Sequence, residues 1–374
     1  MPSLFFSPTP YNIIYIYIYM DIKLQKAPRQ MNIELLRVMC MMMVLALHAN
    51  FSPFGMPDKQ ECLHAALPSF TRCWIETMTI VAVDVFVMIS GWFGLNARRR
   101  SYTSFIFTAL FFSIGSAVFF ATTGYVTFDK DLVLDALQLS KCLWFVKAYL
   151  MLLILSPILN AFVAHTDRRT FATTLIGFFI FQTVFNFFGD GGQQFFSDGY
   201  SPLSFIGLYL LARYMRLYRP RWTQLGARTD LLIYLACGTL MGTLLFLCNG
   251  WHFLPFVRKI VLHYTNPLTI AGATFLLLAF TKLRINRGNR LIGILATASF
   301  AVYVLHCTAP FTETVYHPIV KDIYKNYSGI ACPLLIFSTM CCVYLLCTQL
   351  DQARQWCWKQ LTRAVPWLAG AKAE

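Results

Sequence analysis

Apolar residues occur in long runs along this chain, separated by short stretches rich in charge. Each run spans about 17–22 residues, the length that an α-helix needs to cross the hydrocarbon core of a bilayer. Glycine and proline interrupt some runs, and helix bundles in lipid tolerate both. The pattern predicts an all-α, polytopic membrane protein with about ten transmembrane helices, at residues 32–51, 74–95, 102–122, 143–163, 171–189, 202–218, 231–249, 262–281, 291–311 and 329–350.

The composition indicates that lipid is the solvent for these helices. Hydrophobic residues make up 57% of the 374 residues and charged residues only 13%, whereas a soluble domain is about 25% charged. The mean hydropathy is +0.56. A formal net charge of +14 is compatible with nucleic-acid binding, but the sequence holds no aromatic and basic module of that kind. We therefore expect membrane lipid around the chain and no nucleic-acid partner.

The basic residues indicate how the helices are oriented. When the N-terminus is placed in the cytoplasm, most of the 31 Lys and Arg residues fall in the inner tails and loops, for example Arg168 and Arg169. The outer loops then hold many of the acids, such as Asp58 and Glu61. An excess of positive charge on the cytoplasmic side is the usual bias of membrane proteins. The distribution therefore predicts that both termini are cytoplasmic.

The first 30 residues differ from the rest of the chain. Their Tyr-Ile alternation, as in YNIIYIYIYM, resembles translated repeats of AT-rich DNA, and neither a charged region nor a cleavage site of a signal peptide frames it. We expect residues 1–30 to be a non-native or disordered extension. Residues 31–351 are expected to form the transmembrane domain, and residues 352–374 a cytoplasmic tail.

The first predicted helix carries charge where lipid makes it costly. Its segment RVMCMMMVLALH begins at Arg37 and ends at His48. An arginine at the bilayer centre costs about 2.5–3.5 kcal/mol unless it finds a partner or water. The two residues are about 16 Å apart along the helix axis and lie near the same face. Arg37 alone is compatible with a snorkelling residue and His48 with an interfacial one, so neither establishes a site by itself.

Two further predicted helices place polar residues at similar depth. Asp84, in VDVFVMISGWFGL, lies between the depths of Arg37 and His48. It could pair with Arg37, orient the His48 ring, or only fix helix packing. In SFAVYVLHC, Tyr303 and His306 share a helix face, and His306 lies near the depth of His48. Two histidines at matched depth with an acid nearby predict a polar centre inside the membrane.

Familiar motifs of soluble enzymes are absent from the sequence. There is no Walker A, HExxH or GxSxG pattern, and no Cys-x-x-Cys pair, so we expect no metal. His317 and Asp322 have the HxxxxD spacing of glycerolipid acyltransferases. Because a pattern of two residues arises easily by chance, it carries little weight.

Four short motifs nevertheless follow one another along the chain. They are the Arg-x10-His pair of Arg37 and His48, VDVFVMISG around Asp84, LWF at residues 143–145, and SFAVYVLH ending at His306. With these motifs in this order, the chain resembles acyltransferase family 3, the bacterial surface-glycan O-acetyltransferases. Family members have ten membrane helices with corresponding Arg-x10-His, VDxFFxxSGF, LWF and SFxxYxxH motifs. The resemblance covers about residues 31–350.

The resemblance implies the transfer of an acyl group, most often acetyl, to a hydroxyl of a cell-surface or lipid-linked carbohydrate. It implies acetyl-CoA or another acyl-CoA as the cytoplasmic donor, and a multi-pass location in the cell inner (plasma) membrane. Many members begin the third helix with Arg-x-x-Arg, where this chain has the contiguous residues Arg98, Arg99 and Arg100. Carboxylates that follow LW in one branch are also missing, which points to the branch without an attached esterase-like domain.

The expected site has two ends. On the cytoplasmic side, arginines hold the phosphates of CoA as charge-assisted partners; these are Arg37, Arg98, Arg99 and Arg100. On the outer side, His48 acts as a general base or is itself acylated. Asp84 orients His48, and Tyr303 or His306 donates to the thioester oxyanion. A different class, a transporter that uses the same intramembrane residues as a substrate or proton path, is the alternative.

Overall fold

The computed structural model describes residues 30–140, 143–188, 195–285 and 288–370, and these residues form helices and loops with no β-strand. The predicted all-α fold is therefore confirmed for the described part. The predicted extension at residues 1–30 lies outside it except for Gln30. In chain order the α-helices are α2 (Met31–Phe54), α3 (Lys59–His64), α4 (Ala66–Thr79), α5 (Ala82–Phe93), α6 (Arg99–Thr122), α7 (Lys130–Ala136), α8 (Trp144–His165), α9 (Arg168–Phe188), α10 (Pro202–Tyr218), α11 (Ala227–Trp251), α12 (Pro255–Ile260), α13 (Pro267–Lys282), α14 (Arg290–His306), α15 (Ala309–Phe311), α16 (His317–Asn326) and α17 (Ala331–Ala364).

Each of the predicted apolar segments is helical over most of its length, although residues 74–95 are divided between α4 and α5 and residues 291–311 between α14 and α15. Among the described residues, seven stretches, one of them α4 and α5 together, are long and apolar enough to cross a membrane. An eighth is added if α14 and the helical stretch Ala309–Asn326, which are bent by 79° relative to each other, count as one span. Helix α13 is apolar but shorter, with 16 residues, and α10 has 17 residues. The chain is thus built like a multi-pass membrane protein, while ten spans and two cytoplasmic termini stay predictions.

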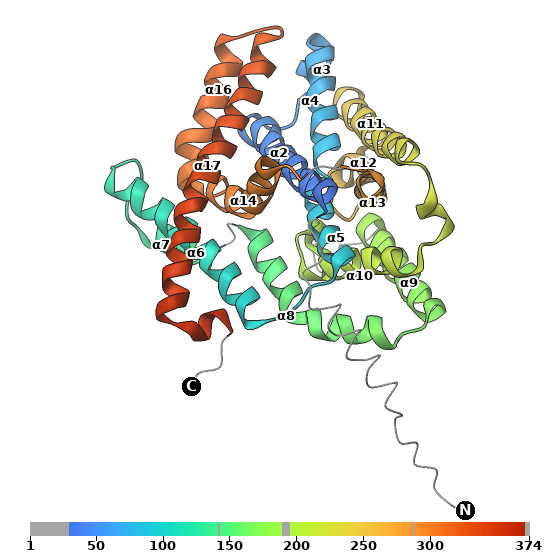
Figure 1. Ribbon diagram of the computed structural model, residues 1–374. Helices are drawn as coiled ribbons and strands as arrows, with labels where there is room; N and C mark the ends of the chain where they lie inside the picture. Colours follow the sequence, from blue (N-terminus) through green and yellow to red (C-terminus); the bar gives the residue numbers. More distant parts are fainter. Residues whose placement is uncertain (1–29, 141–142, 189–194, 286–287, 371–374) are drawn as a thin grey trace, which may run out of the picture.

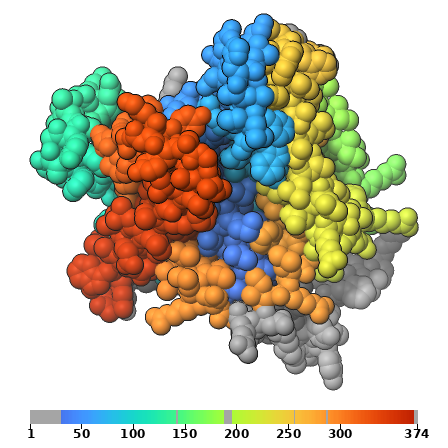
Figure 2. Space-filling model, turned by 90° about the horizontal axis from the view of Figure 1, so that it is seen from above, coloured from blue at the N-terminus to red at the C-terminus, as the bar shows by residue number. Residues whose placement is uncertain are grey.

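Helix α2 lies at the centre of the bundle. It contacts α4, α5 and α13 on one side and α14, α16 and α17 on the other. Figure 1 shows this arrangement, and Figure 2 shows α2, in dark blue, exposed between the red C-terminal helices and the yellow α11. Because α2 carries both Arg37 and His48, its central position brings these two residues next to several other helices.

Close packing of α5 against α10 positions the loop that leads into α6. A Cβ atom on Gly91 would collide with the backbone oxygen of Tyr209, so only glycine allows this approach. The Tyr209 hydroxyl accepts a hydrogen bond from the Leu95 backbone N–H (3.1 Å), and Asn160 donates to the Leu95 carbonyl (2.8 Å). These contacts fix the start of the loop that presents the arginines of α6.

The chain breaks sharply after His306, where α14 ends and Cys307 forms its C-cap. Pro310 has no backbone N–H and cannot donate to the carbonyl of His306, four residues earlier. The hydroxyl of Thr312 makes that hydrogen bond instead, at 2.5 Å. The break is therefore stabilised locally, and it leaves His306 and Cys307 at the end of a helix instead of inside one.

Candidate functional site at the ends of one cavity

A large cavity lies between the helices of the described bundle. Its volume is about 1070 Å³, slightly above the usual range of about 300–1,000 Å³ for small-molecule pockets. Its lining comes mainly from α2, α5, α6, α8 and α14, with Asp351 and Arg354 added by α17. Arg37 and His48 both line it, and they are about 16 Å apart along α2. The cavity therefore connects an arginine end with a histidine end.

The arginine end is formed by Arg37, Arg98, Arg100 and Arg354. Two of these have an acidic partner one turn earlier on the same helix: Arg37 lies 3.4 Å from Glu34, and Arg354 lies 2.7 Å from Asp351. Both acids also line the cavity. With four guanidinium groups against two carboxylates, this end keeps an excess of positive charge that suits a phosphorylated ligand.

Arg99 is the exception among the predicted arginines. It is absent from the lining of the cavity, and its guanidinium stacks over the ring of Trp367, 4.5 Å from the centroid. Thr103, one turn further along α6, donates to the carbonyl of Leu368 (2.8 Å). The C-terminal segment therefore holds Arg99 away from the cavity while Arg98 and Arg100 face it.

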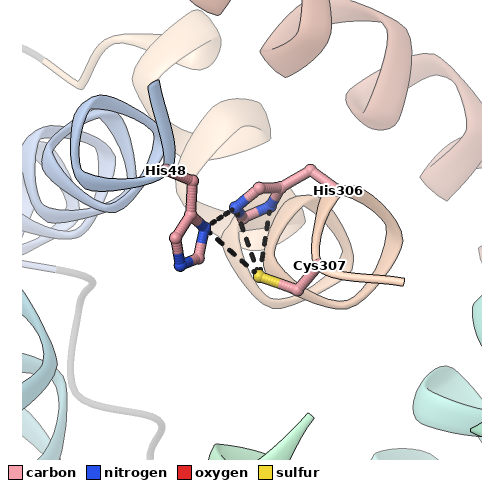
Figure 3. Close-up of side chains that lie close together, drawn as sticks. All are labelled: His48, His306 and Cys307. Carbon is pink, nitrogen blue, oxygen red and sulfur yellow. Dashed lines mark hydrogen bonds between the residues drawn. The ribbon is translucent and has the colours of Figure 1, made fainter. Parts of the chain in front are cut away.

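The histidine end brings together two residues that are 258 positions apart in the sequence. His48 Nδ1 lies 2.9 Å from His306 Nε2, and His306 Nδ1 lies 2.6 Å from the carbonyl oxygen of Val302. Figure 3 shows His48 on one helix facing His306 and Cys307 on another. The His306 ring is fully buried, whereas His48 lines the cavity.

These contacts determine which ring nitrogens carry hydrogens when both imidazoles are neutral. A carbonyl oxygen only accepts, so His306 Nδ1 must donate to Val302. His306 Nε2 is then an acceptor, and His48 Nδ1 must donate to it. That tautomer leaves the lone pair of His48 on Nε2, the atom that points away from His306 in Figure 3. The arrangement prepares His48 Nε2 to accept a proton.

The same contacts correct one predicted role of His306. Both of its ring nitrogens are engaged, one with Val302 and one with His48. No N–H of His306 is left to donate to an oxyanion. Tyr303 lines the cavity one turn earlier, with its ring 6.3 Å from that of His306, and stays the candidate for that role.

Asp84 does not occupy the place that the sequence suggested. Its side chain is almost fully buried on α5, outside the cavity lining, and neither carboxylate oxygen has a hydrogen-bond partner among the described residues. The predicted pairing with Arg37 or His48 is therefore wrong: Arg37 pairs with Glu34, and His306 contacts the His48 ring.

Replacing Asp84 with asparagine is expected to change acyl-group turnover by no more than about twofold, because no hydrogen bond of the described structure is removed. The measurement is turnover per purified protein, beside the melting temperature of the variant. A large loss of turnover in a variant that melts like wild type would show that Asp84 acts on the site.

The HxxxxD pair does not form a unit. His317 is buried and lies 3.1 Å from the Ser52 hydroxyl, whereas the exposed Asp322 accepts from Asn326 (2.7 Å). Each residue has its own partner on its own side of α16. The structure therefore gives no support to a catalytic pair at these positions.

Cys307, Asp351 and Arg354 are among the cavity residues that were not singled out from the sequence. Cys307 lies 3.5 Å from His48 Nδ1 and 3.3 Å from His306 Nε2. Asp351 and Arg354 lie on α17, which continues to Ala364 through the predicted boundary at residue 351. The Asp-x-x-Arg spacing of these two was the only signal in the sequence, because it places an acid and a base one turn apart.

Comparison with known proteins identifies the family of the chain. Residues 31–348 match the model of the acyltransferase domain of acyltransferase family 3. No curated protein and no solved structure matches the chain. The matched region contains the whole histidine end and all the cavity arginines except Arg354. The chain therefore belongs to acyltransferase family 3, and with seven or eight apolar helices of membrane-spanning length in its described part it is a multi-pass membrane acyltransferase.

Proposed function

We propose that this protein transfers an acyl group, most often acetyl, from acyl-CoA to a hydroxyl of a cell-surface or lipid-linked carbohydrate. The observation that carries the proposal is one cavity with arginines at one end and a base-forming histidine pair at the other. A donor with charged phosphates and a thin acyl-bearing arm fits this division. The phosphates stay at the arginine end while the thioester reaches His48.

The arginine end supplies the donor site. Guanidinium groups bind phosphate oxygens through paired, charge-assisted hydrogen bonds. Glu34 and Asp351 hold two of these guanidinium groups in place before the ligand arrives. Since acyl-CoA is made in the cytoplasm, this end faces the cytoplasm in the proposal, and the protein lies in the cell inner (plasma) membrane.

The histidine end supplies the chemistry. His48 Nε2 takes the proton of the acceptor hydroxyl as its oxygen attacks the thioester carbonyl carbon. The tetrahedral intermediate places negative charge on the former carbonyl oxygen, for which the Tyr303 hydroxyl is the proposed donor. The carbon–sulfur bond then breaks, the CoA thiolate takes the proton from His48, and the ester is released. No metal or second cofactor is required by these steps.

Aromatic side chains line the histidine end of the cavity, where the acceptor is proposed to bind. Trp144, Phe145 and Tyr264 line it, with the Trp144 ring 6.0 Å from Phe145 and 5.7 Å from Tyr264. Phe145 in turn contacts Tyr303, with 5.3 Å between ring centroids. Flat aromatic faces beside a few polar groups suit a sugar ring, which is apolar on its faces and polar at its edge. This supports a carbohydrate acceptor.

The direct test is an acyl-transfer assay with the purified full chain. Radiolabelled acetyl-CoA is incubated with the protein and with lipid-linked sugars or soluble glycans, and label is followed into base-labile ester. We expect transfer by wild type and release of an equal amount of free CoA. Label that enters proteoliposomes without ester formation would instead favour the transporter.

His306 acts in this proposal as a positioning residue, through its contact with His48. Replacing it with alanine removes the acceptor for His48 Nδ1 and is expected to lower kcat about a hundredfold. Glutamine offers a carbonyl oxygen at a similar reach, so His306→Gln is expected to recover roughly tenfold of that loss. KM for acyl-CoA should stay unchanged in both. Equal activity of the two variants would contradict the positioning role.

A further inference from the structure

Three potential metal-ligating atoms meet at the histidine end. His48 Nδ1, His306 Nε2 and Cys307 Sγ lie within 4.8 Å of one another, at separations of 2.9, 3.3 and 3.5 Å. They are drawn together in Figure 3. We propose that they form a binding site for a borderline-soft divalent cation, with zinc as the reference ion, and that occupation of this site switches off the base at His48.

The separations suit tetrahedral zinc. Zinc binds imidazole nitrogen at about 2.0–2.1 Å and thiolate sulfur at about 2.3 Å, which places neighbouring ligand atoms about 3.3–3.6 Å apart. The sulfur–nitrogen separation expected for a tetrahedral site is about 3.5 Å, which the 3.5 Å to His48 meets and the 3.3 Å to His306 approaches. The nitrogen–nitrogen separation of 2.9 Å must open slightly. Ligation therefore needs small side-chain movements and no rearrangement of the helices.

The surroundings orient the ligands. His306 Nδ1 donates to the Val302 carbonyl (2.6 Å), so the Nε2 lone pair faces the other two ligand atoms. Metal-binding histidines usually have such a partner for the second ring nitrogen, because it fixes the tautomer and the ring orientation. Cys307 follows directly at the helix break, which brings its sulfur beside the His306 ring.

The site has an open side. His48 and Cys307 line the cavity, while His306 is fully buried behind them. Three protein ligands leave a fourth tetrahedral position for water or another small ligand. Two histidines and one cysteine are also a donor set that selects zinc over magnesium or calcium, which prefer oxygen.

Metal binding at this site releases one proton. The Cys307 thiol becomes a thiolate and releases its proton to solvent, and the metal gains two neutral imidazoles and one negative sulfur. The hydrogen on His48 Nδ1 moves to Nε2, because Nδ1 now binds the metal. Nε2 then carries the hydrogen and cannot accept one. This consequence rests on the proposed function, whereas metal binding itself does not.

Cobalt(II) is the probe for the site, because tetrahedral cobalt–thiolate centres absorb strongly through sulfur-to-metal charge transfer. We expect the purified full chain to develop this band on titration with cobalt, and zinc to remove it. Cys307→Ser should lose the band and bind cobalt at least tenfold more weakly. Cys341→Ser, on α17 outside the cavity lining, is the matched control and should titrate like wild type.

Folding of each variant is checked by its elution in detergent and its melting temperature. His306→Gln keeps the thiol and removes one nitrogen ligand, so it should also weaken cobalt binding. A wild-type protein without the band at saturating cobalt, or a Cys307→Ser variant with an unchanged band, would overturn the site.

The switch is tested separately, by the effect of zinc on acyl transfer relative to each protein's own rate without zinc. Zinc should inhibit wild type, and Cys307→Ser should need at least tenfold more zinc for the same inhibition. Cobalt binding without inhibition by zinc would overturn the switch. A failed transfer assay in protein that still shows the cobalt band would count against the proposed function alone.

Discussion

Replacing His48 with alanine is expected to lower kcat for acyl transfer by about 10²–10⁴-fold, the usual contribution of a general base. The reason is geometric: His48 is the only histidine in the described cavity lining, and its Nδ1 is already held by His306. Acyl-CoA affinity should stay near wild type, since the arginine end is untouched. The measurements are turnover with saturating donor and acceptor, and donor affinity by calorimetry.

His64→Ala is the matched control for this variant. His64 is exposed at the end of α3, where it interacts with Gln60 at 3.1 Å. Its loss removes an imidazole without affecting the described cavity, so turnover should be unchanged. Undiminished transfer by His48→Ala at equal protein level would remove His48 from the mechanism.

The double variant Arg37→Ala/Arg100→Ala is expected to bind acyl-CoA about 10²–10⁴-fold more weakly than wild type. Each charge-assisted contact to a phosphate contributes about 1.5–3 kcal/mol, and each single variant should therefore lose roughly tenfold to a hundredfold in affinity. Both residues line the cavity from different helices, α2 and α6. Calorimetry on detergent-purified protein measures the affinity directly.

Arg99→Ala is the matched control for the donor site, because it removes the same charge from the position directly before Arg100. Arg99 faces Trp367 instead of the cavity, so its loss should leave acyl-CoA affinity within about twofold of wild type, as for an ordinary exposed charge. If Arg99→Ala weakened binding as much as Arg100→Ala, general positive charge would explain the effect, and the assignment of individual arginines would be wrong.

The sequence pattern was sufficient to predict the helices, because long apolar runs in lipid leave the backbone few alternatives to hydrogen bonding within a helix. The pattern was also sufficient to predict the family, since the four motifs lie in order within residues 31–348, which the family model independently matches. The similar depth of His48 and His306 could also be predicted, and the structure brings the two rings together. Depth is a one-dimensional quantity, and counting residues along a helix estimates it well.

Only the tertiary structure shows which side chains or cavity each residue faces. Neighbouring residues on a helix point about 100° apart, so only the docking of α6 decides that Arg100 faces the cavity and Arg99 faces Trp367. The docking of α5 likewise leaves Asp84 outside the cavity lining.

The third ligand atom of the proposed metal site shows the same division between sequence and structure. No metal was predicted because the sequence lacks ligand motifs with short spacing. His48 and Cys307, in contrast, are 259 positions apart. Their contact depends on the packing of α2 against α14 and on the helix break before Pro310. Local sequence fixes how far along the membrane normal a side chain lies, but packing between distant helices decides which side chains it meets.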